Sequence, residues 1–248
     1  MLKTLAYWRK GVRLYVALGI GLVTLEIWWW ASVSYSGSIL FATRMEEAYA
    51  WLAVGLLGLA IAIGPFYSVF PRLPAKQLMR EARRLIGVGA AWFASLHVVI
   101  TYVSLFKLAN PISLPRTYQQ SFVLGAVGLI ILLAMAFTSF DCAQRGMGVW
   151  WYRLHRLVYV AVLVSLLHAF MIGTHATERV PLFILTAVAV SALALHGYIM
   201  FVRRKRLTIW QLLTISGITL LLIAIFSYGY GQKLGYQSID GKQASQHE

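Results

Sequence analysis

The stretch WYRLHRLVYVAVLVSLLHAF, residues 151–170, combines length and apolar character with ionisable side chains. It has about the 20 residues that an apolar helix needs to cross a bilayer. Within it lie two histidines, His155 and His168. Because an ionisable side chain is costly at membrane depth, such a residue usually faces a partner, a cavity or a bound group. The stretch therefore predicts a transmembrane helix that carries chemistry.

The composition of the whole chain agrees with a membrane protein. Of its 248 residues, 60% are hydrophobic and 12% are charged, and the mean hydropathy is +0.71. A soluble domain has about 25% charged residues, so the composition argues against a soluble globular enzyme. The single cysteine, Cys142, excludes an intramolecular disulfide, a four-cysteine iron–sulfur cluster and covalent haem attachment through CxxCH. Any metal site must therefore rely on histidine.

Apolar blocks separated by short charged or proline-bearing segments predict seven transmembrane spans. Their expected ranges are 13–32, 48–70, 85–106, 121–140, 150–173, 181–202 and 208–228. We expect an all-α integral membrane protein with a bundle over residues 1–206, an additional span over 207–228 and a polar outer tail over 229–248. The sequence has no GxGxxG motif that opens a βαβ unit and no Walker P-loop, so no NAD(P)H domain is predicted.

The distribution of positive charge predicts the orientation of the chain. If the N-terminus is cytoplasmic, sixteen of the 22 Lys and Arg residues fall in inner segments, which leaves six outside. Lys and Arg accumulate on the cytoplasmic side of membrane proteins. The net charge of +14 therefore reflects topology and does not indicate a nucleic-acid partner. The expected surroundings are membrane lipid, with the C-terminus on the opposite side from the N-terminus.

Two histidines lie at the same predicted depth in different spans. His97 follows Arg84 by 13 residues and His168 follows Arg153 by 15, which places both roughly 20 Å from the inner margin. Both spans run outward, so the two imidazoles can face each other across the bundle. Such a pair suits the two axial positions of a haem iron, whereas zinc normally takes a third and a fourth protein ligand. The alternative, for each histidine alone, is a neutral ring that packs against a neighbouring helix.

Other candidate site residues lie nearer the inner face. His155 precedes His168 by 13 residues, about 140° away on an ideal helix, so a shared face requires a local distortion such as a π-bulge. Arg83 lies level with His155 and, with Arg153, could bind an anionic haem propionate, a flavin phosphate or a quinone carbonyl. The alternative for these arginines is a positive-inside anchor. His196 could serve a second, inner cofactor or only pack between helices.

Two parts of the sequence resemble the ferric reductase-like transmembrane domain superfamily. One runs from RRLIG at 83–87 to SLH at 95–97, and the other runs from WYRLHRLVY at 151–159 to LH at 167–168. Both look most like the bacterial branch of that superfamily. Within this branch, the pattern is most similar to the haem-binding membrane subunits of periplasmic methionine sulfoxide reductase systems. The resemblance covers roughly residues 48–202.

The resemblance implies a six-helix bundle that holds b-type haem, one or two per chain, with His97 and His168 as iron ligands. It also implies electron transfer across a bacterial inner membrane. The cytoplasmic donor would be a quinol or a flavin such as FMN, and the periplasmic acceptor would be a partner reductase or ferric iron. The chain would then be an oxidoreductase or an electron-transfer subunit without its own NAD(P)H domain.

Two features depart from the pattern of the superfamily. Larger relatives carry two histidines on each ligand helix, whereas Arg83 stands at the second position here. The chain also adds a seventh predicted span and a polar tail, which could be docking surfaces for a periplasmic protein or another membrane subunit. The rival hypothesis is a membrane scaffold or assembly subunit that keeps this fold without a redox role.

Overall fold

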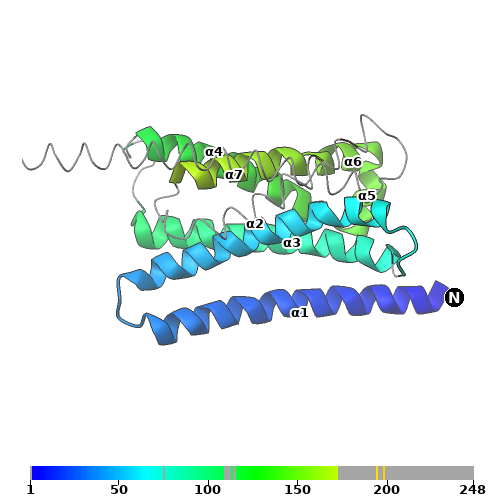
Figure 1. Ribbon diagram of the computed structural model, residues 1–248, viewed down its shortest axis with the longest axis horizontal. Helices are drawn as coiled ribbons and strands as arrows, with labels where there is room; N and C mark the ends of the chain where they lie inside the picture. The colour runs from blue at the N-terminus through cyan, green and yellow to red at the C-terminus, as the bar shows by residue number, and fades with distance from the viewer. Residues whose placement is uncertain are drawn as a thin grey trace, which may run out of the picture.

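The protein is a bundle of long helices (Figure 1). The computed structural model describes residues 2–74, 76–108, 113, 116–172, 194 and 198, and no strand occurs among them. The long helices are α1 (Leu2–Ser34), α2 (Leu40–Val69), α3 (Lys76–Ile100) and α4 (Arg116–Phe137). The shorter helices are α5 (Asp141–Met147), α6 (Val149–Arg156) and α7 (Val158–Ile172). A π-helical turn, η1 (Thr101–Leu105), extends α3.

Four helices of the described region are long and apolar enough to cross a membrane. Their spanning parts are Gly11–Ser34, Leu40–Tyr67, Glu81–Leu105 and Tyr118–Phe137. They coincide with the first four predicted spans, so the prediction of an all-α, multi-pass membrane protein is confirmed. The predicted spans 181–202 and 208–228, together with the tail, lie outside the described residues apart from two isolated positions. The total of seven spans therefore stays a prediction.

Helix α2 begins earlier than hydropathy predicts, at Leu40 rather than at residue 48. The added turns contain charged residues, among them Arg44 and Glu47, which form an ion pair of 3.0 Å three residues apart. Such pairs stabilise a helix, so the helix extends beyond its apolar stretch. As a consequence, Glu46 lies within a membrane-crossing helix instead of in a connecting loop.

The predicted fifth span, 150–173, consists of two helices that meet at Leu157. The backbone N–H of Leu157 donates to the carbonyl of Leu154 at 2.9 Å, a step of three residues in place of the α-helical four. This tightened turn lies between His155 and His168, where a common face required a distortion. The distortion is a 3₁₀-type turn and not a π-bulge.

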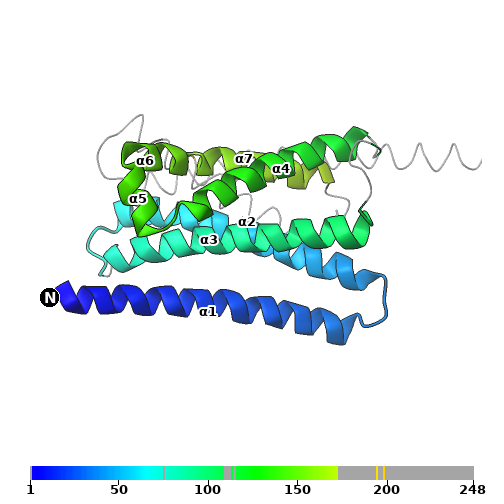
Figure 2. The same ribbon diagram turned by 180° about the vertical axis from the view of Figure 1, so that it is seen from behind.

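The helices pack as two pairs with α1 alongside. Helix α2 packs against α3 and α4 against α7, and α1 lies against α3 and α2 on the side away from α4 (Figures 1 and 2). Small residues permit close approach between membrane helices. At Gly89 of α3, for example, a Cβ would lie 2.9 Å from Cδ1 of Ile20 in α1. Tyr49 of α2 also joins α1, because its hydroxyl donates to the carbonyl of Thr24 at 3.0 Å.

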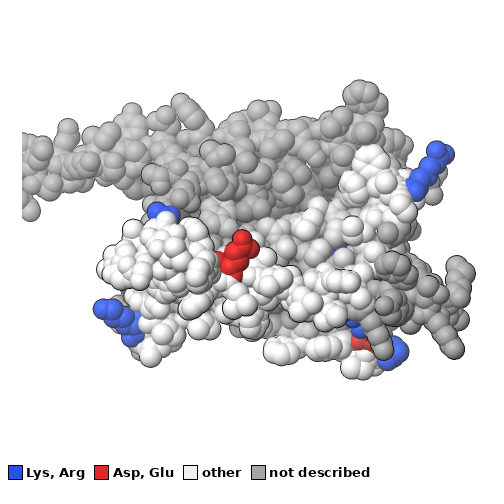
Figure 3. Space-filling model, turned by 90° about the horizontal axis from the view of Figure 1, so that it is seen from below, with Lys and Arg blue, Asp and Glu red and all other residues white. Residues whose placement is uncertain are grey.

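The main apolar core forms where the two helix pairs meet. Its buried residues are Leu57, Ile61, Ala90, Ala91, Leu132, Met135, Val158, Ala161, Val162 and Leu166. By contrast, large apolar side chains of α1 such as Leu14, Leu22 and Leu25 are exposed. Figure 3 shows the molecule from the α1 side, where the described surface has basic groups towards its two ends and an acidic group among uncharged residues between them. Exposed apolar side chains such as those of α1 are expected where helices meet lipid.

Candidate functional site

The structure brings the rings of His97 and His168 together. Their centroids lie 6.2 Å apart and their planes make an angle of 81°. His97 comes from the last turn of α3, and His168 comes from α7 close to its end. With metal–nitrogen bonds of about 2 Å and a ring centroid about 1 Å behind each nitrogen, two imidazoles on one metal have centroids about 6 Å apart. The observed separation therefore fits two imidazoles that would bind one metal ion.

Glu46 of α2 determines which nitrogen of His97 carries the proton. Nδ1 of His97 lies 2.6 Å from the carboxylate Oε2 of Glu46 and 3.2 Å from the backbone carbonyl oxygen of the same residue. A carboxylate and a carbonyl only accept hydrogen bonds, so Nδ1 is the donor. Nε2 of His97 is thus left with its lone pair, which is the form that binds a metal.

The backbone carbonyl of Ser121 in α4 determines which nitrogen of His168 carries the proton. Nδ1 of His168 lies 2.8 Å from the carbonyl oxygen of Ser121 and 3.0 Å from its hydroxyl. Because the carbonyl only accepts, Nδ1 carries the proton here as well. The fully buried Ser121 hydroxyl in turn donates to the carbonyl of His168 at 3.3 Å. Among the described residues, neither His97 nor His168 forms a hydrogen bond through Nε2.

Gly125 of α4 provides the space that the His168 ring occupies. A Cβ at this position would lie 2.8 Å from Cε1 and 2.9 Å from Nδ1 of His168, closer than real side chains come. Gly87 of α3 differs, because a Cβ there would meet nothing within 4 Å. Gly125 is therefore close to a histidine ring, whereas the similarly close Gly89 faces Ile20 of α1.

Two imidazoles are the donor set of this site. Within the described ranges, no three His, Cys, Asp or Glu side chains form a group that could hold a metal ion. A zinc site built from protein ligands would need such a group. An iron porphyrin supplies its own equatorial nitrogens and takes only axial ligands from the protein. The nitrogens present therefore fit haem.

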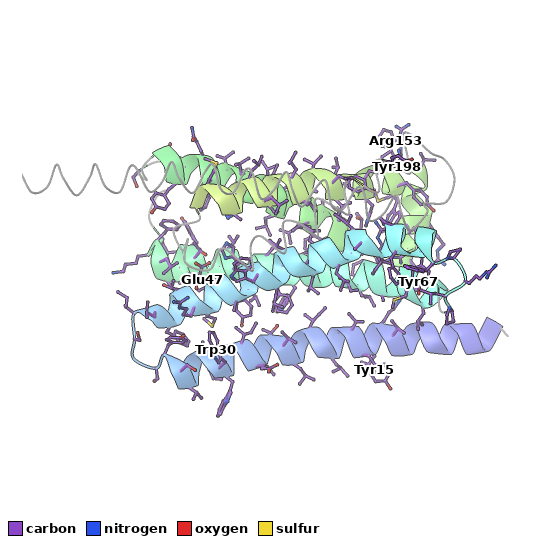
Figure 4. All side chains as sticks on the ribbon, in the orientation of Figure 1. Tyr15, Trp30, Glu47, Tyr67, Arg153 and Tyr198 are labelled. Atoms are coloured by element: carbon purple, nitrogen blue, oxygen red, sulfur yellow. The ribbon has the colours of Figure 1, made fainter. Side chains whose placement is uncertain are left out.

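A second polar cluster surrounds His155 at the other end of the bundle. Figure 4 labels Glu47 towards one end of the bundle and Arg153 at the opposite end. Nε2 of His155 lies 3.2 Å from the hydroxyl oxygen of Thr138, and its ring stacks on Trp151 with centroids 3.9 Å apart. The indole N–H of Trp151 donates to the carbonyl of Thr138 at 2.8 Å. His155 therefore contacts a cluster of its own.

The turn at Leu157 lets both histidines of the predicted fifth span face the same neighbour. His168 bonds to Ser121 near the beginning of α4, and His155 bonds to Thr138, the residue that follows α4. An undistorted helix would point the two rings about 140° apart. The structure thus places His155 and His168 along one side of α4, at two different depths.

Asp141 of α5 joins three helices beside the His155 cluster. It accepts hydrogen bonds from Arg13 of α1 at 2.8 Å and from Arg84 of α3 at 2.7 Å. Arg13 also contacts Glu81 of α3 at 3.2 Å. The hydrogen bond from Arg13, followed by the one from Arg84, holds the pKa of Asp141 below its usual range, although partial burial opposes the shift. We call Arg13, Glu81, Arg84 and Asp141 the ion-pair cluster.

The predicted site arginines take different positions. Arg83 forms a side-chain hydrogen bond with Tyr159 and lies close enough to His155 to interact with it electrostatically. Arg153 is exposed, and its guanidinium lies over the ring of Trp150 at 4.7 Å. Thus Arg83 belongs to the surroundings of His155, whereas Arg153 lies on the surface. His196 lies outside the residues that the structure describes.

Sequence reasoning missed Glu46 and Ser121. Glu46 was outside the predicted span, although an acidic residue at the edge of an apolar block is a signal for a buried partner. Ser121 carries no comparable signal, because its backbone carbonyl makes the decisive contact and any residue type supplies a carbonyl.

Comparisons with known proteins relate the chain to membrane redox components. Residues 49–166 match the family described as "Ferric reductase like transmembrane component". The chain is 29% identical over 181 residues to "Protein-methionine-sulfoxide reductase heme-binding subunit MsrQ" of Pasteurella multocida, covering 71% of this chain and 84% of the relative. A protein of the same name from Cronobacter sakazakii is 36% identical over 100 residues, covering 39% and 50%. The namesake from Bordetella pertussis is 29% identical over 153 residues, covering 60% and 70%.

Proposed function

We propose that this chain, whose residues 49–166 match the ferric reductase-like transmembrane family, is a haem-binding electron-transfer subunit of a bacterial inner membrane. The observation that carries the proposal is the pair of His97 and His168, with ring centroids 6.2 Å apart. Each ring has its Nδ1 proton held by an acceptor, which leaves each Nε2 available. The relatives are named as haem-binding subunits of a protein-methionine-sulfoxide reductase, which supports the same role here.

In this proposal, His97 and His168 are the residues that would hold haem b. When bound, haem supplies a one-electron iron couple whose potential depends on its ligands and their hydrogen bonds. Ser121 and Glu46 orient the two imidazoles, and Gly125 keeps the position of the His168 ring clear. Protein groups that orient metal-binding histidines in this way are part of the function of a metal site.

The donor would approach the end of the bundle that carries His155. We propose a quinol or a flavin such as FMN, with Arg83 and the exposed Arg153 attracting an anionic group of the donor or a propionate of a second haem. His155 and His196 are the proposed ligands or contacts of that inner group. The asymmetry of Lys and Arg supports this end as cytoplasmic. Electrons would leave at the His97 end for a periplasmic reductase or ferric iron.

The test is a reduced-minus-oxidised absorption spectrum of the purified full chain, with haem quantified per chain. We expect a b-type spectrum in the wild type, lost in His97→Ala and in His168→Ala. His175→Ala is the matched control, because the proposal gives this histidine no role and the spectrum should be unchanged. A well-folded wild type without haem after haem-replete expression would reject the proposal and favour the scaffold hypothesis.

The number of haems follows from the same measurement. If His155 and His196 hold a second haem, His155→Ala and His196→Ala are expected to lower the haem content per chain while the His97–His168 spectrum persists. An unchanged haem content in both variants would leave one haem per chain, with a quinone or a flavin as the inner group.

A further inference from the structure

Glu46 is the acidic residue in contact with the proposed ligand pair. Its Oε2 lies 2.6 Å from Nδ1 of His97, and the two side chains are only 14% and 20% exposed. The hydroxyl of Thr101, in the π-helical turn after His97, lies 3.3 Å from the same oxygen. Glu46 therefore accepts a short hydrogen bond from His97, and both side chains are largely buried.

The two histidines differ in the charge of the group that accepts their Nδ1 proton. For His97 the nearest acceptor is a carboxylate oxygen, whereas for His168 it is the neutral backbone carbonyl of Ser121 at 2.8 Å. Hydrogen bonds to an ionised acceptor are roughly twice as strong as neutral ones. The site therefore has one strongly polarised imidazole and one weakly polarised imidazole.

A polarised imidazole is a stronger donor through its other nitrogen. A carboxylate that accepts the Nδ1 proton raises the basicity of the ligand, so Nε2 donates more electron density to the metal. This favours the more highly charged, oxidised metal. The negative charge of a carboxylate in a medium of low dielectric acts in the same direction. Both effects make reduction of the metal less favourable.

We propose that Glu46 is a positioning residue that lowers the reduction potential of the group held by His97 and His168. This inference rests on the function proposed above. The carboxylate on the His97 side would control how readily an electron is passed on. The neutral carbonyl on the His168 side would only hold the imidazole ring in position. A purely structural Glu46, which only ties α2 to α3, would change stability and leave the potential alone.

The experiment is an equilibrium redox titration of the haem-loaded full chain in detergent, followed by its absorption spectrum. For Glu46→Gln, which keeps the size of the side chain and removes its charge, we expect the low-spin b-type spectrum to persist. We expect the equilibrium constant for reduction to rise at least tenfold, which is about 59 mV for one electron. The thermal stability of each variant is measured in parallel, because a structural role would change only that quantity.

Glu47→Gln is the matched control. It removes the neighbouring carboxylate, which pairs with Arg44. This variant should retain the wild-type potential. A rise in Glu47→Gln as large as that in Glu46→Gln would overturn the inference, because the effect would then be one of general charge.

Glu46→Asp covers the case in which Glu46→Gln does not retain haem. It withdraws the carboxylate from Nδ1 by one methylene, so we expect a smaller rise in potential. A wild-type potential in Glu46→Asp, or in a haem-bearing Glu46→Gln, would overturn this inference and leave the proposed function standing. A wild type that binds no haem would overturn both.

Discussion

Residues of this site act by leaving room for a neighbouring ring as well as by forming hydrogen bonds. The His168 ring fits against α4 only because residue 125 has no side chain, and the ring is then in place for its 2.8 Å hydrogen bond to the carbonyl of Ser121. A methyl group at residue 125 would have to displace the ring, since the backbone of a packed helix cannot easily retreat. The position of the His168 ring is thus set by the neighbouring helix.

Replacing Gly125 by Ala is therefore expected to weaken haem binding. Loss of a group that orients a ligand typically costs about 10-fold to 100-fold in metal affinity, and we expect a change in that range. Haem transfer to apomyoglobin measures it. Gly87→Ala is the control, because it adds the same methyl group to a helix where nothing lies within 4 Å. Equal haem retention in both variants would contradict the role of Gly125.

Residue counting along the sequence predicted that the rings of His97 and His168 lie close together. The distances from Arg84 to His97 and from Arg153 to His168 placed both rings at one depth, and the structure brings them together. The hydrogen-bond acceptors could not be predicted in the same way. They depend on where α2 begins and on how α4 is rotated, which are consequences of packing and not of residue type.

At the scale of helices, Asp141 is the group on which three elements converge. Arg13 of α1 and Arg84 of α3 both donate to it, and it belongs to α5. A carboxylate whose pKa is lowered on folding stabilises the folded state above its unfolded pKa, about 3.9. This contribution is lost as the pH falls through the lower, folded pKa. The connection between α1, α3 and α5 should therefore weaken only in acid.

Asp141→Asn tests this pH dependence. At pH 7 we expect its apparent Tm in detergent to lie about 2–4 °C below the wild type, the change that about 1 kcal/mol produces in a chain of this size. The effect is modest because the side chain of Asp141 is 36% exposed and exposed ion pairs contribute little. The two melting curves should converge as the pH is lowered below 3.9. A constant difference between pH 7 and pH 3 would show that the charge of Asp141 is not the cause.

The helix pattern was predictable except where local hydrogen bonding departs from the α-helix. Hydropathy predicted the first four spans, and the angle between His155 and His168 predicted a distortion in the next one. Neither observation could assign the distortion to Leu157 or predict its 3₁₀ type. A turn of this kind differs from an α-helical turn by one hydrogen-bond step, which residue composition does not specify.

For the whole molecule, labelling of the single cysteine can test the membrane orientation that the distribution of Lys and Arg predicts. Cys142 is exposed in α5, the segment that the positive-inside pattern assigns to the cytoplasm. In intact spheroplasts we expect a membrane-impermeant maleimide to leave Cys142 unlabelled, and permeabilisation should allow labelling. No other cysteine complicates the measurement, because the chain has only one.

A cysteine introduced between α1 and α2 tests the opposite side of the membrane. Ser36 is exposed there, so Ser36→Cys in a Cys142→Ser background should be labelled in intact spheroplasts. Labelling of Cys142 but not of residue 36 would mean that the orientation is inverted. Donor and acceptor would then have to exchange sides in the proposed function.

The contact between Glu46 and His97 also bears on how the chain is made. Both residues belong to the α2–α3 hairpin, whereas His168 follows about 70 residues later, which takes roughly 4–14 s of synthesis. During that interval the bilayer would otherwise surround an acid and an imidazole that lack the rest of the bundle. Because Glu46 and His97 already have each other as hydrogen-bond partners, the α2–α3 hairpin can remain in the membrane in this form until His168 is synthesised and inserted.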